Sequence, residues 1–373
     1  MSALVALAAG GTGGHMFPAE ALARELLGRG FRVALITDRR GQAFGDKLPG
    51  VSLHRIRAGR FGAGLASKVM GLAALALGTL QAGRLLRALA PAIAVGFGGY
   101  PSVPTMLAAS RLKLPTLIHE QNAILGRANR LLAPRATVIA TAFAEVGAVR
   151  PADRARLVLT GNPVRPAIAA LGGAPYRPPE ADGPFEILII GGSQGARVLS
   201  EVVPAAFAAL PEAFRRRLRV TQQARAEDLE AVRRAHAASG VAAELATFFA
   251  DVPERLARAH LVISRSGAST MAELTVIGRP AILVPYLHAA DDHQTANARA
   301  LEKAGGAWVM AQDSISAGAL AETIAALMAA PDRLARAAAA AHAQGRPDAA
   351  RALADLVAAT ATDGHARPRE NAA

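Results

Sequence analysis

Two segments of this chain share one pattern, in which a run of apolar residues leads into a glycine-rich bend. The first runs from Leu4 into Gly10-Gly-Thr-Gly-Gly-His15, and the second runs from Ile187 into Gly191-Gly-Ser-Gln-Gly-Ala196. A bend of this kind between a strand and a helix bares backbone N–H groups at the helix N-terminus, where partial positive charge favours an anion. A chain that builds this feature twice is expected to contain two facing α/β domains.

Neither bend fits the two commonest glycine fingerprints. Met16 stands at the third glycine position of a dinucleotide-binding loop that would start at Gly11, and no Gly-Lys-Ser/Thr sequence follows either bend. The interpretation as a phosphate site therefore stays, while a redox cofactor or a P-loop becomes a weaker hypothesis. Asp38, which follows the second expected strand, keeps a dinucleotide-dependent oxidoreductase open as an alternative.

The length and the cysteine content limit the remaining possibilities. A chain of 373 residues is too long for one ordinary core and fits two domains. It contains no cysteine, so disulfides and thiolate sites are excluded and a reducing compartment is compatible. The first ten residues lack a basic segment and are typical of a first strand rather than of a secretory signal. We therefore expect a cytoplasmic protein.

The net charge of +13 is placed unevenly along the chain. Between Lys47 and His119 there is no Asp or Glu, although Lys and Arg recur throughout this block, which should attract anions to one domain. Nucleic acid is not the partner we expect, because the block holds few aromatic residues for base stacking (Phe61, Phe97 and Tyr100) and no RNA- or DNA-binding signature.

The same block contains an apolar stretch with helical periodicity. Its longest run without charge or strong polarity, Val69 to Leu80, is well short of the roughly 20 apolar residues that span a bilayer, so we expect no transmembrane helix. The stretch is either a buried core helix or a helix that lies on an anionic lipid surface, and periodicity alone leaves both open. The residues expected to contact such a surface are Leu65, Lys68, Val69, Leu72, Leu75, Arg84 and Arg87.

Strand-like apolar runs alternate with helical runs over most of the chain. This alternation, with continuous apolar strands, predicts the α/β class with doubly wound parallel sheets. The expected strands are Leu4–Ala9, Arg32–Thr37, Ile93–Phe97, Thr116–His119, Thr137–Ala140, Phe185–Ile190, Arg219–Thr221, Leu261–Ser264 and Ala281–Val284.

Glycines and prolines between residues 161 and 179 predict the connection between the domains. We expect a first domain over residues 1–163, joined by a C-terminal helix from about 342–360. The second domain is expected over 164–341, and residues 361–373 form a polar tail.

Open α/β sheets bind ligands beyond the carboxyl ends of their strands, and the residues suited to chemistry fall in loops at those positions. Six of these loops, in the same order and with similar spacing from about residue 3 to about 345, resemble the MurG family of peptidoglycan N-acetylglucosaminyltransferases. The motifs are Gly10-Gly-Thr-Gly-Gly-His15, Gly98-Gly-Tyr100, His119-Glu-Gln-Asn122, Gly161-Asn-Pro-Val-Arg165, Gly191-Gly-Ser-Gln-Gly-Ala196 and Arg265-Ser-Gly-Ala268.

The resemblance implies a GT-B fold, in which two Rossmann-like domains face each other across a cleft. It implies UDP-N-acetylglucosamine as the donor. It implies lipid I, the undecaprenyl-diphosphate-linked N-acetylmuramoyl pentapeptide, as the acceptor, and a β-1,4 bond formed with inversion to give lipid II. A single displacement of this kind needs a base for the attacking hydroxyl and charges that stabilise the departing UDP.

The family assigns the base to the position of His15. An imidazole titrates near pH 6.5 and suits that role, although from the residues alone His15 could equally cap the helix or orient the glycine loop. The resemblance places acceptor contacts at Gly11, Thr12, Gly13, Gly14, Gly98, Gly99 and Tyr100.

Donor contacts are implied in both domains. Arg165 and Arg265 would supply positive charge to the diphosphate, Phe248 and Phe249 would flank the uracil, and Glu273 would bind the ribose diol. The full set of implied donor contacts is Thr12, Gly13, Gly14, Asn122, Arg165, Gly192, Ser193, Gln194, Phe248, Phe249, Arg265, Ala268, Ser269, Thr270, Glu273, His293 and Gln294.

Several of these residues also have a structural interpretation. The glycines could serve only tight turns, the Phe pair could be core, and Arg265 could form a structural ion pair. Some relatives have two glutamines at positions 293 and 294, so His293 departs from that version. A metal cluster of His288, Asp291, Asp292 and His293 matches no standard ligand spacing, and we expect neither metal nor cofactor.

With this acceptor, the resemblance favours membrane contact for the apolar basic block. It implies a peripheral enzyme on the cytoplasmic face of the inner membrane, with an anionic phospholipid surface and cell-wall or division proteins as further partners. A transferase of the same fold with another lipid acceptor remains the nearest alternative. A non-catalytic membrane scaffold is the third, and it would have no use for His15, Glu273 and Gln294 together.

Overall fold

The computed structural model describes residues 2–10, 13–38, 49–58, 64–192 and 195–366, and for 65–68 and 363–366 it describes the backbone alone. The chain divides into two compact units. The first comprises Met1–Arg165 together with Asp348–Ala373, and the second comprises Pro166–Pro347. The sequence predicts the first boundary after residue 163, two residues before the observed one, and the second near residue 342, six residues before the observed one.

The first unit is built on a parallel sheet that has seven strands in its described part, in the order β3-β2-β1-β4-β5-β6-β7. The strands are β1 Leu4–Ala8, β2 Arg32–Thr37, β3 Val51–Arg55, β4 Ile93–Gly96, β5 Thr116–Glu120, β6 Val138–Thr141 and β7 Leu157–Leu159. The sheet order reverses at β1 and β4, so the loops that follow these two strands diverge at the place where α/β sheets usually bind ligands.

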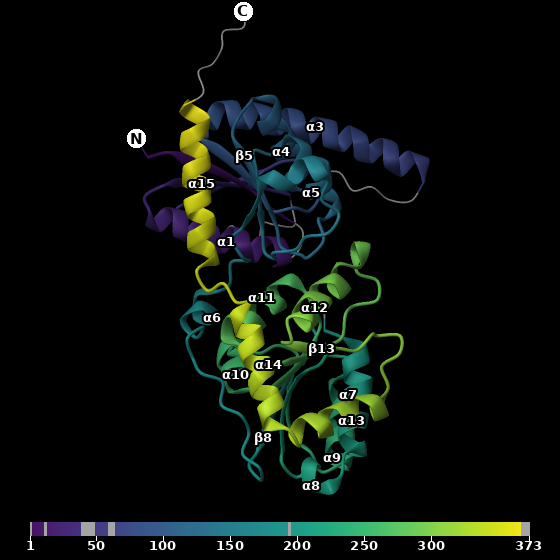
Figure 1. Cartoon of the computed structure of the whole chain (residues 1–373). Helices are drawn as coiled ribbons and strands as arrows, with labels where there is room; N and C mark the ends of the chain where they lie inside the picture. The colour runs from purple at the N-terminus through teal and green to yellow at the C-terminus, as the bar shows by residue number, and fades with distance from the viewer. Residues whose placement is uncertain (1, 11–12, 39–48, 59–63, 193–194, 367–373) are drawn as a thin grey trace, which may run out of the picture. The chain divides into compact units, whose positions relative to one another are not determined.

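Helices cover both faces of this sheet, as continuous apolar strands require. One face packs against α1 (Gly13–Gly28) and α15 (Ala349–Ala366), which lie side by side in Figure 1. The other face packs against α3 (Leu65–Leu89), α4 (Ser102–Arg111) and α5 (Arg127–Leu132). The C-terminal helix thus completes the first core, because Leu353, Ala354 and Val357 are fully buried against the N-terminal strands.

The long helix α3 packs closely on the unit through small residues on one side. Gly71, Gly78, Ala82 and Leu86 are buried at spacings of about two turns or one turn, which defines an inner face. A Cβ at Gly78 would lie 2.0 Å from the carbonyl oxygen of Arg57, so only glycine allows this approach. Among the described residues, Val69–Leu89 is the one helical stretch long and apolar enough to cross a membrane. Because its inner face is buried in this core, we interpret α3 as a helix of the domain.

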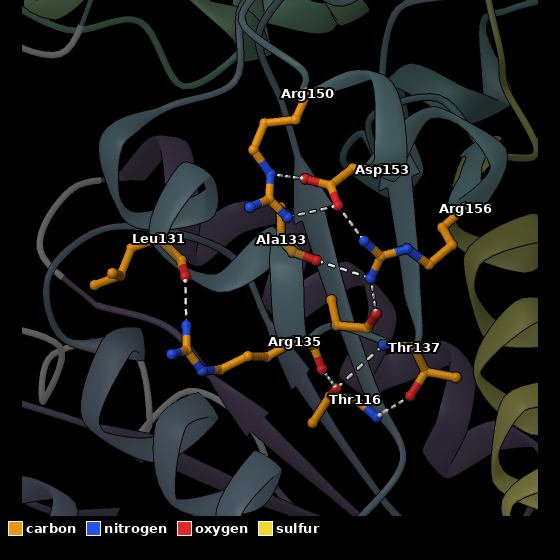
Figure 2. A network of polar contacts seen from close by, with 9 residues as sticks. Thr116, Leu131, Ala133, Arg135, Thr137, Arg150, Asp153 and Arg156 are labelled. Atoms are coloured by element: carbon orange, nitrogen blue, oxygen red, sulfur yellow. Dashed lines mark hydrogen bonds and ion pairs between the residues drawn. The ribbon is translucent and has the colours of Figure 1, made fainter.

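The edge strand β7 is held by a buried carboxylate. Asp153, in the 3₁₀ segment Pro151–Arg156, is 1% exposed and accepts hydrogen bonds from Arg150 and Arg156. Figure 2 shows Asp153 between the two guanidinium groups, with Arg156 reaching on to the carbonyl of Ala133. Hydrogen bonds from Arg150 are the largest cause of an Asp153 pKa below the ordinary value. The network anchors the residues that lead into β7.

The second unit repeats the plan with six strands in the described residues, in the order β10-β9-β8-β11-β12-β13, all parallel. The strands are β8 Phe185–Ile190, β9 Leu218–Gln223, β10 Ala242–Ala246, β11 Leu261–Ser264, β12 Ala281–Leu283 and β13 Ala307–Val309. The helices are α6 Pro166–Ala170, α7 Arg197–Ala209, α8 Glu212–Arg215, α9 Leu229–Ala238, α10 Val252–Arg258, α11 Ala268–Ile277, α12 His293–Lys303, α13 Ala317–Met328 and α14 Pro331–Ala343.

A buried arginine joins two helix ends in this unit. Arg279 is 2% exposed and donates to the carbonyls of Leu256 and Ala257 near the end of α10, and to those of Ile277 and Gly278 at the end of α11. A cation at helix C-termini meets their partial negative charge and satisfies carbonyls that lack helical partners. The side chain therefore fixes α11, whose other end lies at the carboxyl edge of the sheet.

The α/β class with doubly wound parallel sheets is confirmed, as are all nine strands expected from the sequence. Four strands were missed, and they are β3, β7, β10 and β13, the two edges of each sheet. The expected C-terminal segments were also wrong in extent. The last helix starts at Ala349, after the Gly345-Arg-Pro347 break, and continues to Ala366 instead of ending near 360, because Val357 and Ala361 stay packed on the core.

Candidate active site

In the first unit, three neighbouring strands end beside one another and carry the loops with the predicted motifs. β1 leads into α1, β4 leads into Gly98-Gly-Tyr100, and β5 leads into Gln121 and Asn122. Gly98 and Gly99 have φ values of 81° and 71°, which favour glycine. Because β1, β4 and β5 are adjacent and parallel, their loops gather at the same edge of the sheet.

His15, in the first turn of α1, is the imidazole that this gathering brings against the other loops. Its Nδ1 lies 3.2 Å from Oε1 of Gln121, which follows β5. A Cβ at Gly99 would lie 3.1 Å from Cδ2 of His15, and one at Gly98 would lie 3.5 Å from Cε1. The ring is therefore held between an amide and a glycine turn, and it is partly exposed.

Gln121 is itself tied to a second histidine. Its Nε2 lies 3.0 Å from Nδ1 of His119, and the Nε2 of His119 lies 2.9 Å from the carbonyl oxygen of Gly161. His119 has no exposed surface, and this burial lowers its pKa to about 4, so it is neutral at pH 7. The sequence motif His119-Glu-Gln-Asn122 thus supplies a buried polar chain that ends at His15.

Glu120 organises the loop that follows β5. Its carboxylate accepts from the backbone and side-chain nitrogens of Asn122 at 3.0 and 3.1 Å, from the amide of Gly126 at 2.9 Å and from Nδ2 of Asn129 at 2.8 Å. Four donors on a carboxylate that is 1% exposed hold the loop in one conformation. Asn122, a predicted donor contact, is therefore oriented by Glu120.

The remaining predicted residues of the first unit are placed as follows. Gly13 and Gly14 open α1, and Tyr100 is 41% exposed on the β4 loop. Gly11 and Thr12 lie outside the described residues. Arg165 is the last residue of the first unit, directly before α6 of the second.

In the second unit, the glycine bend after β8 leads into α7 as predicted. Gly192 and Gly195 have φ values of 83° and 69°, and a Cβ at Gly191 would lie 2.5 Å from the backbone nitrogen of Ala196. This bend is too tight for any side chain at position 191 and turns the backbone between strand and helix. Ser193 and Gln194 lie outside the described residues.

The helix α11 begins directly after the neighbouring strand β11. Ala268, Ser269 and Thr270 form its first turn, and Glu273 is partly buried one turn further along. Strands β8 and β11 are paired, so the α11 N-terminus and the glycine bend lie at the same sheet edge of this unit. The arrangement offers helix N-termini for phosphate and a carboxylate for a diol.

Arg265 differs from its expected setting. Its guanidinium is buried, with Nη1 2.9 Å from the carbonyl oxygen of Val284 and 3.1 Å from that of Pro285, and it lies 5.4 Å from the ring of Tyr286. The structure gives this side chain carbonyl partners and a ring rather than the ion pair considered above. Arg265 thus anchors the loop after β12.

The chain then enters α12, which begins with the two residues expected to recognise the donor sugar. Oε1 of Gln294 accepts from the amide of Tyr286 at 3.0 Å, and the carbonyl of Gln294 accepts from Oγ of Ser266 at 2.7 Å. His293 opens α12 with Nδ1 2.7 Å from the carbonyl oxygen of Ala290. In the part of the chain that the structure describes, no three His, Asp or Glu side chains gather in a way that could hold a metal ion.

The phenylalanine pair is split between two environments. Phe248 is 74% exposed, whereas Phe249 is 7% exposed and lies under the guanidinium of Arg255, 4.3 Å from its ring centroid. Arg255 is held in turn by Glu244 and Asp251. Phe249 is thus a core residue, and Phe248 is the member of the pair that a ligand could reach.

Four of the residues expected to contact a membrane, Val69, Leu72, Arg84 and Arg87, lie along one side of α3 together with Ala76 and Leu80. These side chains are exposed and recur every three or four residues. This outer stripe is apolar for three turns and then basic. Leu75 is partly buried and packs on the core instead, and the side chains of Leu65 and Lys68 lie outside the described residues.

Sequence reasoning did not single out the residues that support His15. Glu120, Gln121 and Asn129 are buried polar residues whose partners lie on other strands and loops. The available signal was the position of His119-Glu-Gln-Asn122 at the end of a buried strand, since four polar residues in a row there need hydrogen-bond partners.

Comparisons with known proteins agree with this architecture. The chain matches the glycosyltransferase family 28 N-terminal domain over residues 5–141 and the glycosyltransferase family 28 C-terminal domain over residues 186–353. It is 61% identical over 363 residues to a Rhodospirillum centenum protein named UDP-N-acetylglucosamine–N-acetylmuramyl-(pentapeptide) pyrophosphoryl-undecaprenol N-acetylglucosamine transferase, covering 97% of this chain and 96% of that protein.

Two further similarities are as extensive. A Paramagnetospirillum magneticum protein with the same name is 60% identical over 355 residues, covering 95% of this chain and 96% of that protein. The crystal structure of MurG from Acinetobacter baumannii superposes with a TM-score of 0.80 at 30% identity, covering 96% of this chain and 99% of that one.

Two parallel-sheet units, each with a glycine bend after a central strand, and both family 28 domains define a glycosyltransferase of the GT-B fold. The alignments cover nearly the full length of this chain and of its relatives. Within this class, the chain belongs to the MurG family.

Proposed function

We propose that this chain transfers N-acetylglucosamine from UDP-N-acetylglucosamine to the 4-hydroxyl of the N-acetylmuramic acid of lipid I, giving lipid II. The observation that carries the proposal is the 61% identity, over 97% of the chain, to a relative named for this transfer. The first-unit motifs Gly98-Gly-Tyr100 and His119-Glu-Gln-Asn122 favour this acceptor over another one.

In the proposed reaction, Nε2 of His15 takes the proton of the 4-hydroxyl while its oxygen attacks the anomeric carbon of the donor. The new C–O bond forms as the bond to the diphosphate breaks, and UDP leaves with the electron pair. A positioned base typically contributes 10²- to 10⁴-fold to such a step. His15 suits this role because it is partly exposed, lies in the first turn of α1 and is held by Gln121, which follows β5.

The leaving diphosphate would be stabilised in the second unit by the glycine bend after β8 and by the first turn of α11. Glu273 would bind the ribose, and Phe248 would contact the uracil from its exposed position. With Arg165 as the additional cation, the proposal needs no resident metal ion. Turnover that survives chelation with EDTA is the expected result.

The acceptor is lipid-linked, so the enzyme must work at a membrane. We place it on the cytoplasmic face of the inner membrane as a peripheral protein, docked on anionic phospholipid through the outer stripe of α3. The stripe supports this, because Val69, Leu72 and Leu80 are 57%, 58% and 62% exposed and Arg84 follows on the same side. Apolar insertion and attraction to anionic lipid add to each other. Cell-wall or division proteins are its expected neighbours there, which cross-linking in cells would test.

The assay for the transfer measures UDP release from UDP-N-acetylglucosamine with and without a short-chain lipid I analogue. We expect release only when the analogue is present. Equal release with an unrelated lipid-linked sugar would favour the alternative of a different acceptor.

The docking proposal has a matched test. Leu72→Asp with Leu80→Asp should weaken sedimentation with vesicles of anionic phospholipid at least tenfold and leave turnover of a soluble acceptor unchanged. Leu131→Asp, at a leucine of α5 that is 48% exposed, is the control and should bind vesicles as the unchanged protein does. Unaltered vesicle binding by the α3 variant would remove this surface from the docking role.

A further inference from the structure

The orientation of the Gln121 side chain is determined by its surroundings. Its Nε2 lies 3.0 Å from the carbonyl oxygens of both Phe97 and His119, and these oxygens only accept hydrogen bonds. Turning the amide over would place oxygen against oxygen in a site where Gln121 is 1% exposed. Oε1 must therefore be the atom that faces Nδ1 of His15 at 3.2 Å.

The proton positions of His119 follow in the same way. Its Nε2 lies 2.9 Å from the carbonyl oxygen of Gly161, so this nitrogen carries the hydrogen. In the neutral ring, Nδ1 is then an acceptor, and it faces the amide nitrogen of Gln121 at 3.0 Å. His119 thus reinforces the same orientation of the Gln121 amide that the two carbonyls impose.

The position of the His15 ring is restrained from another side by the β4 loop. The positive φ angles of Gly98 and Gly99 bring the backbone close enough that a Cβ at position 99 would lie 3.1 Å from Cδ2 of His15. The loop therefore limits how far the ring can move, and Nδ1 is the ring atom that lies within hydrogen-bond distance of Gln121.

We propose that Gln121 is a positioning residue that fixes the proton of His15 on Nδ1, so that Nε2 carries the lone pair that accepts the proton of the acceptor hydroxyl. Oε1 of Gln121 only accepts, so Nδ1 of His15 donates to it. In a neutral imidazole with Nδ1 protonated, Nε2 is the basic atom. Gln121 acts on the reaction through His15. The inference rests on the proposed function for the role of His15, but the proton position itself is a property of the free protein.

The second unit offers a matched control. Gln222 is also buried beside a histidine, with Oε1 2.8 Å from Nε2 of His236 and Nε2 3.3 Å from the carbonyl oxygen of Leu199. Gln121→Met and Gln222→Met remove the same amide from equally buried sites. If Gln121 had only a structural role, the two variants would give equivalent results for the proton position of His15 and for kcat.

The first measurement is the proton position of His15 in ¹⁵N-histidine-labelled full-length protein, above the pH at which the ring titrates. The His15 signals are assigned by their loss in His15→Ala. We expect Nδ1 protonated and Nε2 unprotonated in the unchanged protein and in Gln222→Met, and a mixture of both forms in Gln121→Met. A His15 ring protonated on Nε2 in the unchanged protein would overturn the proposal, and this outcome needs no variant to fold.

The second measurement is turnover with UDP-N-acetylglucosamine and the lipid I analogue. Gln121→Met should lower kcat by about 10- to 100-fold with an unchanged KM for the donor, since only the base is affected. Gln222→Met should keep kcat. Unchanged kcat in Gln121→Met contradicts the proposal. Absence of turnover in the unchanged protein, together with the expected proton position, contradicts the proposed function instead.

Discussion

Each unit buries a glutamine against a histidine, and the two pairs differ in where they lead. In the second unit, Oε1 of Gln222 accepts from His236, which lies on α9 and is 2% exposed, and the hydrogen-bonded pair ends inside the core. In the first unit, the amide nitrogen of Gln121 faces the buried His119, and its oxygen passes on to the partly exposed His15. A buried histidine is thus no sign of chemistry by itself. The connection to a group at the ligand-binding edge of the sheet is the informative feature.

The largest effect that tests this comparison is the loss of activity at the two histidines. His15→Ala should lower kcat by about 10²- to 10⁴-fold, the usual contribution of a positioned base, and leave binding of UDP-N-acetylglucosamine unchanged. His236→Leu should keep kcat within about threefold, because the pair it belongs to ends in the core. Steady-state UDP release and donor titration calorimetry measure both. Normal turnover by His15→Ala would remove this residue from the base role and break the comparison.

A smaller effect concerns stability in acid, where the two buried histidines should behave alike. Burial lowers the pKa of both His119 and His236 from 6.5 to about 4. Between these pH values the unfolded chain binds a proton that the folded chain does not. Folding stability contributed by each neutral histidine is therefore present above pH 6.5 and is lost as the pH falls towards 4, by up to about 3 kcal/mol for each.

Replacing either histidine should flatten the acid limb by a similar amount. Unfolding of His236→Gln is followed by the fluorescence of Trp308, the one tryptophan of the chain, which lies on β13 of the second unit. The stability of the first unit in His119→Gln is measured by hydrogen exchange of the β5 amides. Urea unfolding at pH 7, 5 and 4 gives the comparison. An acid limb unchanged in His236→Gln would assign the loss of stability to other groups.

The contrast between central and edge strands explains how much of the fold the sequence predicts. Central strands such as β1 and β11 are buried at every position, so their continuous apolar runs are easy to find. The edge strands β3, β7, β10 and β13 are partly exposed, and their mixed composition hides them. Their pairing partners are set by the finished sheet, which a local pattern does not contain.

The candidate site follows the same logic. The glycine bends and His15 could be found because a turn with positive φ and a strand-to-helix bend leave local signals at Gly98, Gly99 and Gly192. The roles of Glu120 and Gln121 could not, since their partners come from Asn129, Phe97 and His15 on other elements. Likewise, both carbonyl partners of Arg265 lie in the loop after β12, and only the fold reveals them.

The smallest effect separates loss of stability in the second unit from loss of catalysis. Ser316 caps α13, with Oγ accepting from the amide of Ala319 at 3.2 Å, and α13 packs into the core through the fully buried Leu320 and Ile324. Ser316→Ala should lower the free energy of unfolding reported by Trp308 by about 1 kcal/mol, the usual cost of losing an N-cap. Turnover at 25 °C should not change, because the folded population remains close to complete after a loss of this size.

Ser316→Ala is therefore a reference for Gln222→Met, because it shows how a loss of stability in the second unit affects kcat. We expect such a loss to leave kcat unchanged. If Ser316→Ala lowered kcat in proportion to stability, then activity would report folding, and the contrast between the two glutamine–histidine pairs would have to be measured by the proton position of His15 instead.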